Sequence, residues 1–317
     1  VKLPAIGRIE IAIIEEFLPE LLSFEKGELD YIGLGGQVLG RVTQDGKIRP
    51  EFAARGVRHV RAVLPSLVFT YFNMDDPQLG GTTPDRIALR RAIGMGFNTP
   101  DFIRVMYHGQ ALPANQLLPP HVDGHDASLP AKATYDPAAA RALLDRFGYK
   151  DRDGDGWREM PDGKPFVLVH SSLPDSWSRE ADTLWLKSME AIGIRMRVNT
   201  APFADLLKQS LAGQLPMFNL GYRALDPSGY QILSTLWSRS PPDTNRSRFR
   251  QPEYDAAYEA FLRTAPGPER NALAKRMSEL VQNYAPMSLQ VYSVNNAFLH
   301  PWVRGYWPSP FGFAWKY

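Results

Sequence analysis

Short apolar runs alternate with helix-length amphipathic segments along most of the chain. The runs Ile9–Ile14 and Leu29–Leu34 flank such a segment, Glu16–Lys26. Strand, helix and strand in this order are typical of a βαβ unit, so we expect these two strands to share a parallel sheet. Further apolar, β-rich runs predict strands at Val57–Leu64 and Leu67–Phe72.

Three predicted helices begin with a side-chain acceptor followed by proline. Their starts are Thr83-Pro84-Asp85, Asn98-Thr99-Pro100 and Asp136-Pro137. Side-chain oxygens of Thr, Asn and Asp can accept from the free N–H groups of the first helical turn, and proline suits the position after the cap. The third helix is predicted at Ala138–Phe147, because glycine is favoured directly after the end of a helix and Gly148 occupies that position.

The second half of the chain continues to alternate between strands and helices. Strands are predicted at Phe166–His170, Ile194–Asn199, Met217–Gly221 and Ser288–Val294, and helices at Arg179–Ile192, Phe203–Ala212, Tyr254–Arg263 and Glu269–Tyr284. Apolar residues recur at helical spacing in the helix that begins at Arg179, so one of its faces should be buried. The whole order predicts an α/β fold.

The composition is that of an ordinary globular protein. The chain has 317 residues, of which 44% are hydrophobic and 22% charged, and its net charge is +2. Because positive and negative charges nearly balance, the sequence predicts no basic surface for binding nucleic acid. The chain has no cysteine, which excludes disulfides, thiolate metal sites and cysteine nucleophiles.

The start of the chain resembles the middle of a domain. Val1 stands where an initiator methionine would be expected, so we expect an upstream segment to be missing. The sequence contains no recognisable signal peptide and no apolar run of bilayer-spanning length.

Four stretches in this order resemble family 5 of the bacterial extracellular solute-binding proteins, whose members bind oligopeptides, dipeptides or nickel for ABC importers. They are LLSFEKGELDYIGL (21–34); FTYFNMDDP with DRIALRRAIGMGFN (69–98); QLLPP, YDP and ARALLDRFG (116–148); and GYRALDPSGYQI (221–232). Each stretch alone is weak, but together they extend over most of the chain. The chain is therefore identified as the C-terminal part of a member of this family.

The resemblance implies a periplasmic binding protein-like α/β fold, with two lobes joined by a hinge (class II type). Residues 1–66 and 287–317 would form part of lobe I, and residues 67–286 a nearly complete lobe II. The implied function is capture of a peptide or other small solute between the lobes and delivery to an inner-membrane ABC permease. An alternative is the effector-sensing domain of a transcription regulator, which can reuse this fold.

The same resemblance implies a periplasmic, monomeric and non-enzymatic protein with no cofactor and no nucleic-acid partner. Motifs for acyl transfer, phosphate binding, dinucleotide binding and zinc-dependent hydrolysis are absent from the sequence. The ligand stays open, because one fold serves many solutes.

The segment Gly221–Tyr230 supplies the candidate ligand residues Arg223, Asp226 and Tyr222. In peptide-binding members, an Asp three residues before an acidic-Pro pair holds the α-ammonium of the ligand. Here the pair is Asp226-Pro227, and Arg223 occupies the position of that Asp. Arginine has only donors, so it could hold a carboxylate or phosphate but not an ammonium. The alternatives are that Arg223 and Asp226 pair with each other, or that the Arg223 side chain points into solvent.

Four aromatic or amide residues are further candidates for ligand contact. Trp177 lies in a predicted strand-to-helix loop, where open α/β sheets carry binding residues, and Ser178 is expected to cap the helix. Tyr71, Asn73 and Tyr292 lie near the proposed lobe crossovers. For all four, packing against neighbouring elements is the alternative.

The segment Asp151–Asp162, DRDGDGWREMPD, resembles a calcium-binding loop. Asp151, Asp153 and Asp155 precede Gly156, and Asp162 occupies the twelfth position. Two features count against a site: the twelfth residue is Asp rather than the longer Glu, and a strand rather than a helix follows. A structural calcium ion is the most that this pattern predicts.

Overall fold

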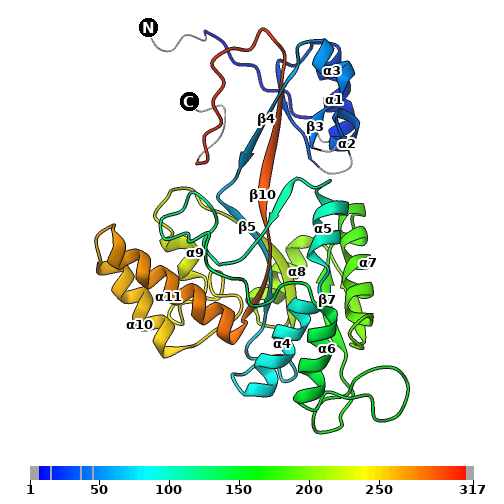
Figure 1. Cartoon of the computed structure of the whole chain (residues 1–317), viewed down its shortest axis with the longest axis vertical. Coiled ribbons are helices and arrows are strands. Elements are labelled where there is room, and N and C mark those ends of the chain that lie inside the picture. Colours follow the sequence, from blue (N-terminus) through cyan, green and yellow to red (C-terminus); the bar gives the residue numbers. More distant parts are fainter. Residues whose placement is uncertain (1–6, 15, 36–37, 45, 312–317) are drawn as a thin grey trace. The chain divides into compact units, whose positions relative to one another are not determined.

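The computed structural model describes residues 7–14, 16–35, 38–44 and 46–311 (Figure 1). The chain divides into two units with separate sets of internal contacts. The first unit consists of Val1–Arg61 and Asn295–Trp307, and the second of Ala62–Val294 and Pro308–Tyr317. Each unit is described by itself below.

The first unit is a small α/β assembly with short elements. It contains α1 (Phe17–Glu25), β1 (Tyr31–Gly33), α2 (Leu39–Val42), β2 (Thr43–Gln44), β3 (Lys47–Ile48) and α3 (Pro50–Ala54), with the start of β4 (Arg58–Val63) and the end of β10 (Met287–Leu299). Leu21 and Phe24 of α1 are buried against Ile32 of β1 and Phe298 of β10. These apolar residues come from both ends of the chain, so both ends are needed to build this core.

The predicted parallel pairing in the first unit is wrong. Residues 9–14 form no strand, and the side chain of Ile13 is 92% exposed. Strand β1 pairs antiparallel with β10, with Tyr31 opposite Leu299. An apolar run becomes a strand only when a neighbour satisfies its backbone groups. None of the described residues offers that pairing to residues 9–14.

The second unit is built on a mixed sheet. Besides residues 287–294 of β10, its strands are β5 (Ser66–Phe72), β6 (Ala111–Pro113), β7 (Leu168–Ser172), β8 (Met196–Thr200) and β9 (Met217–Arg223). Five of them follow the order β10–β5–β9–β7–β8, and β6 pairs with β10. Strand β5 is antiparallel to both neighbours, whereas β7 is parallel to β8 and β9. The carboxyl ends of β7, β8 and β9 therefore meet at one edge.

Three helices of the second unit start directly after the predicted caps Thr83, Asn98 and Asp136, although the Thr83 side chain makes no capping hydrogen bond. The helices of this unit are α4 (Pro84–Gly96), α5 (Thr99–Met106), α6 (Pro137–Arg146), α7 (Ser176–Glu190), α8 (Phe203–Leu211), α9 (Tyr230–Ser234), α10 (Pro252–Arg263) and α11 (Pro268–Tyr284). Asn98 accepts from the N–H of Asp101 and Asp136 from that of Ala139. None of the helices formed by the described residues is both long and apolar enough to cross a membrane.

Each face of the second unit's sheet carries its own hydrophobic core. Successive residues of β5 point to opposite faces, so Leu67, Phe69 and Tyr71 enter one core and Phe72 the other. Helices α8 to α11 contribute to the first core, and α4 to α7 to the second (Figure 1). Burial on both faces explains why β5 is a continuous apolar run rather than an alternating one.

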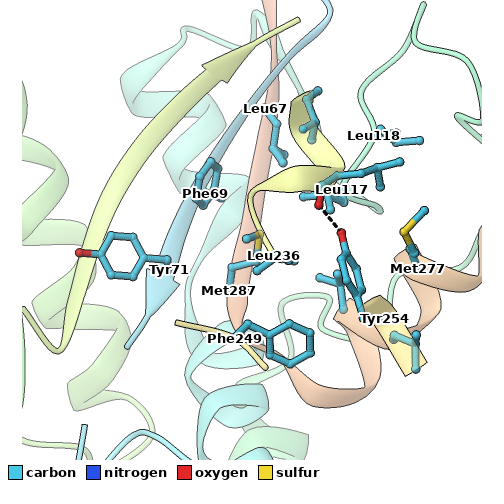
Figure 2. Packing of buried hydrophobic residues seen from close by; sticks show 14 of the residues in the cluster. Leu67, Phe69, Tyr71, Leu117, Leu118, Leu236, Phe249, Tyr254, Met277 and Met287 are labelled. Atoms are coloured by element: carbon cyan, nitrogen blue, oxygen red, sulfur yellow. Dashed lines mark hydrogen bonds between the residues drawn. The ribbon is translucent and has the colours of Figure 1, made fainter. Parts of the chain in front are cut away.

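A buried tyrosine connects two helices in the first core. The Tyr254 hydroxyl donates to the Leu233 carbonyl at 2.8 Å, shown by the dashed line in Figure 2. Tyr254→Phe should lower the free energy of unfolding by about 1–2 kcal/mol, because a buried carbonyl loses its donor. Urea denaturation measures this. The half-exposed Tyr135, changed to Phe, is the control and should stay within about 0.5 kcal/mol of the unchanged protein.

Candidate functional site

A cavity of about 460 Å³ opens beside strands β5 and β9 of the second unit. Its walls include Tyr71, Tyr222, Gln231 and Arg246, and we call it the tyrosine cavity. The Tyr71 hydroxyl lies 2.6 Å from Ser210 Oγ. Burial raises the pKa of Tyr222 to about 12, so its hydroxyl keeps its proton and donates to Gln231 Oε1. Arg246 Nη1 is buried without a hydrogen-bond partner among the described residues.

The candidate residues Arg223 and Asp226 lie next to this cavity in the chain. Arg223 is the last residue of β9, where it pairs with Ser66 of β5, and it is exposed. The half-buried Asp226 accepts from the backbone N–H of Ser228 at 2.8 Å and from the Ser228 hydroxyl. The Asp226 carboxylate therefore stabilises the turn that leads into α9.

A second cavity, of about 340 Å³, lies where strand β7 leads into helix α7. Trp177 and Trp185 line it, and we call it the tryptophan cavity. Trp177 is 42% exposed, and its ring meets that of Phe102 edge to face at 6.3 Å between centroids. The cap of α7 is Asp175, which accepts from the Ser178 N–H, so the predicted role of Ser178 as cap is wrong. The predicted loop position of Trp177 is also wrong, because α7 begins at Ser176 and places Trp177 in its first turn.

Phe203 belongs to the walls of both cavities. It is the first residue of α8, and 51% of its surface is exposed. Strand β9 contributes to both cavities as well: Asn219 lines the tryptophan cavity and Gly221 lines the tyrosine cavity. The two cavities are therefore neighbours on the second unit.

The tryptophan cavity has a polar floor. His170 of β7 and Asp182 of α7 are both buried, and their nearest nitrogen and oxygen are 3.6 Å apart. Burial lowers the pKa of His170 to about 4, so its ring is neutral near pH 7. Burial raises the pKa of the Asp182 carboxyl, a hydrogen bond from Ser172 opposes the rise, and the charge of Asp175 adds to it.

Asn73 and Tyr292 are buried and hydrogen-bonded within the second unit. The Asn73 side chain donates to the Gly213 carbonyl and accepts from the Asp75 N–H. The Tyr292 hydroxyl donates to the Gln116 carbonyl at 2.8 Å. Neither residue lines the two cavities described above.

In the acidic loop, carboxylates of Asp151, Asp153, Asp155 and Glu159 lie within 4.8 Å of one another. Glu159, rather than the predicted Asp162, is the fourth member of this group. The Asp162 carboxylate is paired with Lys164 at 2.7 Å. The oxygens of Asp151 accept from two backbone N–H groups of the loop, and Asp155 is paired with Arg195. Calcium binding here stays a prediction.

Several residues of the cavities were not sequence candidates, and His170, Asp182 and Phe203 are the ones that matter here. Asp182 carried a usable signal, because it lies next to Ala181 and three residues before Trp185, on the face of α7 predicted to be buried. A carboxylate on a buried face needs a partner or a function. His170 and Phe203 carried no such signal, since both fit the ordinary pattern of their elements.

Sequence comparison places the chain among solute-binding proteins. Residues 1–244 match the model of bacterial extracellular solute-binding proteins, family 5. Heme-binding protein A of Haemophilus influenzae is 27% identical over 231 residues, which are 72% of this chain and 40% of that protein. Di/tripeptide-binding protein 1 of Pseudomonas aeruginosa is 24% identical over 72% of this chain and 41% of its own length. The chain thus spans about two fifths of these relatives.

Solved structures of the same fold cover nearly the whole chain. HbpA2 from Haemophilus parasuis matches 95% of this chain and 55% of its own, with a TM-score of 0.76 and 19% identity. The oligopeptide-binding protein AppA from Bacillus subtilis, in complex with a nonapeptide, matches 94% of this chain and 57% of its own. The TM-score is 0.74 and the sequence identity 15%. The predicted periplasmic binding protein-like α/β fold class is confirmed.

Proposed function

The chain belongs to family 5 of the bacterial extracellular solute-binding proteins, and from this premise we propose that it is the ligand-binding part of an ABC importer's substrate-binding component. The observation that carries the proposal is the pair of neighbouring cavities on the second unit, which share Phe203. Aromatic walls with a few convergent polar groups are typical of sites for small molecules. The family match gives no support to the alternative of a transcription regulator.

The two cavities offer different chemistry to a solute. The tyrosine cavity supplies the guanidinium of Arg246 as a donor and the carboxylate of Asp243 as an acceptor, whereas the tryptophan cavity supplies acceptors and apolar walls. A peptide or another small solute with groups of both kinds would match this pair. Its capture needs only non-covalent contacts, so the solute would be released unchanged to a membrane permease. We expect a monomeric protein in the periplasm that binds no nucleic acid.

Native mass spectrometry of the full-length protein, purified from its own host, tests this function. We expect a mass shift that corresponds to one small molecule per protein, and the same molecule should be recovered intact after denaturation. Conversion of the retained molecule during incubation would instead indicate an enzyme. A protein that retains no molecule, and binds none from a peptide and solute library, would refute capture.

Arg223 is proposed to bind an anionic group of the solute, because its exposed guanidinium ends β9 directly after Tyr222 of the tyrosine cavity. Arg223→Ala should weaken binding of the retained solute about 10-fold, the loss of one charge-assisted hydrogen-bonded contact. Isothermal titration of the full-length protein measures this. Arg104→Ala, on an exposed helix outside both cavities, is the control, and equal affinities for the two variants would contradict the assignment.

A further inference from the structure

The floor of the tryptophan cavity holds a buried carboxylate with an unsatisfied oxygen. Asp182 is 7% exposed, and its Oδ1 has no hydrogen-bond partner among the described residues. The nearest basic atom is His170 Nε2 at 3.6 Å, beyond hydrogen-bond distance. His170 Nδ1 and Ser171 Oγ are also buried without partners in the described part of the chain. A buried carboxylate oxygen without a partner calls for an explanation, and both Asp182 and His170 line the tryptophan cavity.

The charges around Asp182 have one sign. His170 is neutral near pH 7, so it does not compensate a carboxylate, and Asp175 at the mouth of the cavity adds a second negative charge. Among the described residues that line this cavity there is no lysine or arginine. A buried carboxylate is costly without a cation or several donors. A cation from outside the chain would supply that partner.

The walls define what kind of cation fits. Trp177, Trp185, Phe102 and Phe203 surround the polar floor, and aromatic faces attract cations as well as apolar stems. A metal ion is a poor match, because His170 and Asp182 form no group of three or more metal-ligating side chains with any other described residue. The cavity fits an organic cation whose stem is apolar or aromatic.

We propose that the tryptophan cavity binds a cationic group of the transported solute, an ammonium, amidinium or guanidinium on an apolar stem, with Asp182 as the counter-ion. The proposal rests on the proposed function and names the class of solute. In the bound state the cation takes the place of the missing partner of Asp182 Oδ1, and Trp177 covers its stem. Asp182 is thus a specificity-determining residue.

Two probes of nearly the same shape test this. Benzamidine carries an amidinium on a phenyl ring, and benzamide is its neutral counterpart. Binding to the full-length protein is followed by the indole N–H resonance of Trp177, which is assigned with the Trp177→Phe variant. We expect benzamidine to bind at least about ten times more tightly than benzamide. Asp182→Asn, which keeps the shape of the side chain, should abolish this preference.

Asp205→Asn is the matched control, because Asp205 is an exposed carboxylate on α8 that lines neither cavity, and it should keep the preference. Equal affinity of the unchanged protein for the two probes, or no response of Trp177 to benzamidine, overturns the proposal even if Asp182→Asn does not fold. A retained solute without a cationic group also overturns it but leaves solute capture intact. If the full-length protein binds no solute at all, the proposed function itself fails.

Discussion

Replacing Arg90 with alanine is expected to destabilise the second unit by about 3–5 kcal/mol, because three buried carbonyls lose a charged donor. Arg90 lies on α4, is 1% exposed, and donates to the carbonyls of Leu79, Tyr284 and Ala285. Two of these carbonyls belong to the end of α11 and the residue after it. Burial lowers the pKa of Arg90 to about 10, so the guanidinium stays charged at neutral pH.

Urea denaturation followed by circular dichroism measures this loss. Arg90→Lys should lose less than Arg90→Ala, because lysine keeps the charge but cannot reproduce the geometry of the guanidinium. The control is Arg104→Ala: Arg104 is exposed and pairs with Asp101 on the surface, so the expected change is below about 1 kcal/mol. Similar losses for Arg90→Ala and Arg104→Ala would contradict the structural role of Arg90.

Phe203→Ala is expected to weaken solute binding by about 10- to 100-fold, because one ring supplies a wall to both cavities. The side chain is half-exposed, so its removal should cost little stability. Isothermal titration with the retained solute measures the change in affinity. Leu262→Ala is the control, since Leu262 on α10 is equally exposed and lines neither cavity. Unchanged affinity in Phe203→Ala would show that the solute binds elsewhere.

Elements whose sequence signals lie within a few neighbouring residues are predicted best. Asn98 and Asp136 cap their helices as expected, because a cap needs only its own first turn. The strand at 9–14 failed for the opposite reason: its apolar pattern is local, but strand formation depends on a distant partner. The antiparallel partner of β1 lies at the other end of the chain, and no local pattern encodes that pairing.

The binding site was harder to predict, because cavities arise from packing. The positions of Trp177, Tyr71 and Tyr222 in the chain predict ligand contact, and each lines a cavity. The position of Tyr292 predicts the same, but Tyr292 is buried with its hydroxyl satisfied. Sequence position alone cannot separate these cases, because an aromatic ring suits a wall and a core equally well. Asp182 and His170 come together only when β7 and α7 pack.

The solute specificity of the proposed site depends on charge as well as shape. The described residues that line the tryptophan cavity include Asp175 and Asp182 but no lysine or arginine, whereas Arg246 and Asp243 both line the tyrosine cavity. A solute with a cationic group on one side and acceptors on the other would match both. These charged side chains favour a solute with polar or charged groups over a purely apolar one.

Hydrogen exchange of the full-length protein, with and without its retained solute, tests the central claim most directly. The claim is that the second unit captures the solute at the two cavities. Backbone amides of residues 171–178 and 219–226, which lie at these cavities, should exchange more slowly when the solute is bound. Binding that leaves both segments unchanged and protects other parts of the protein would contradict it.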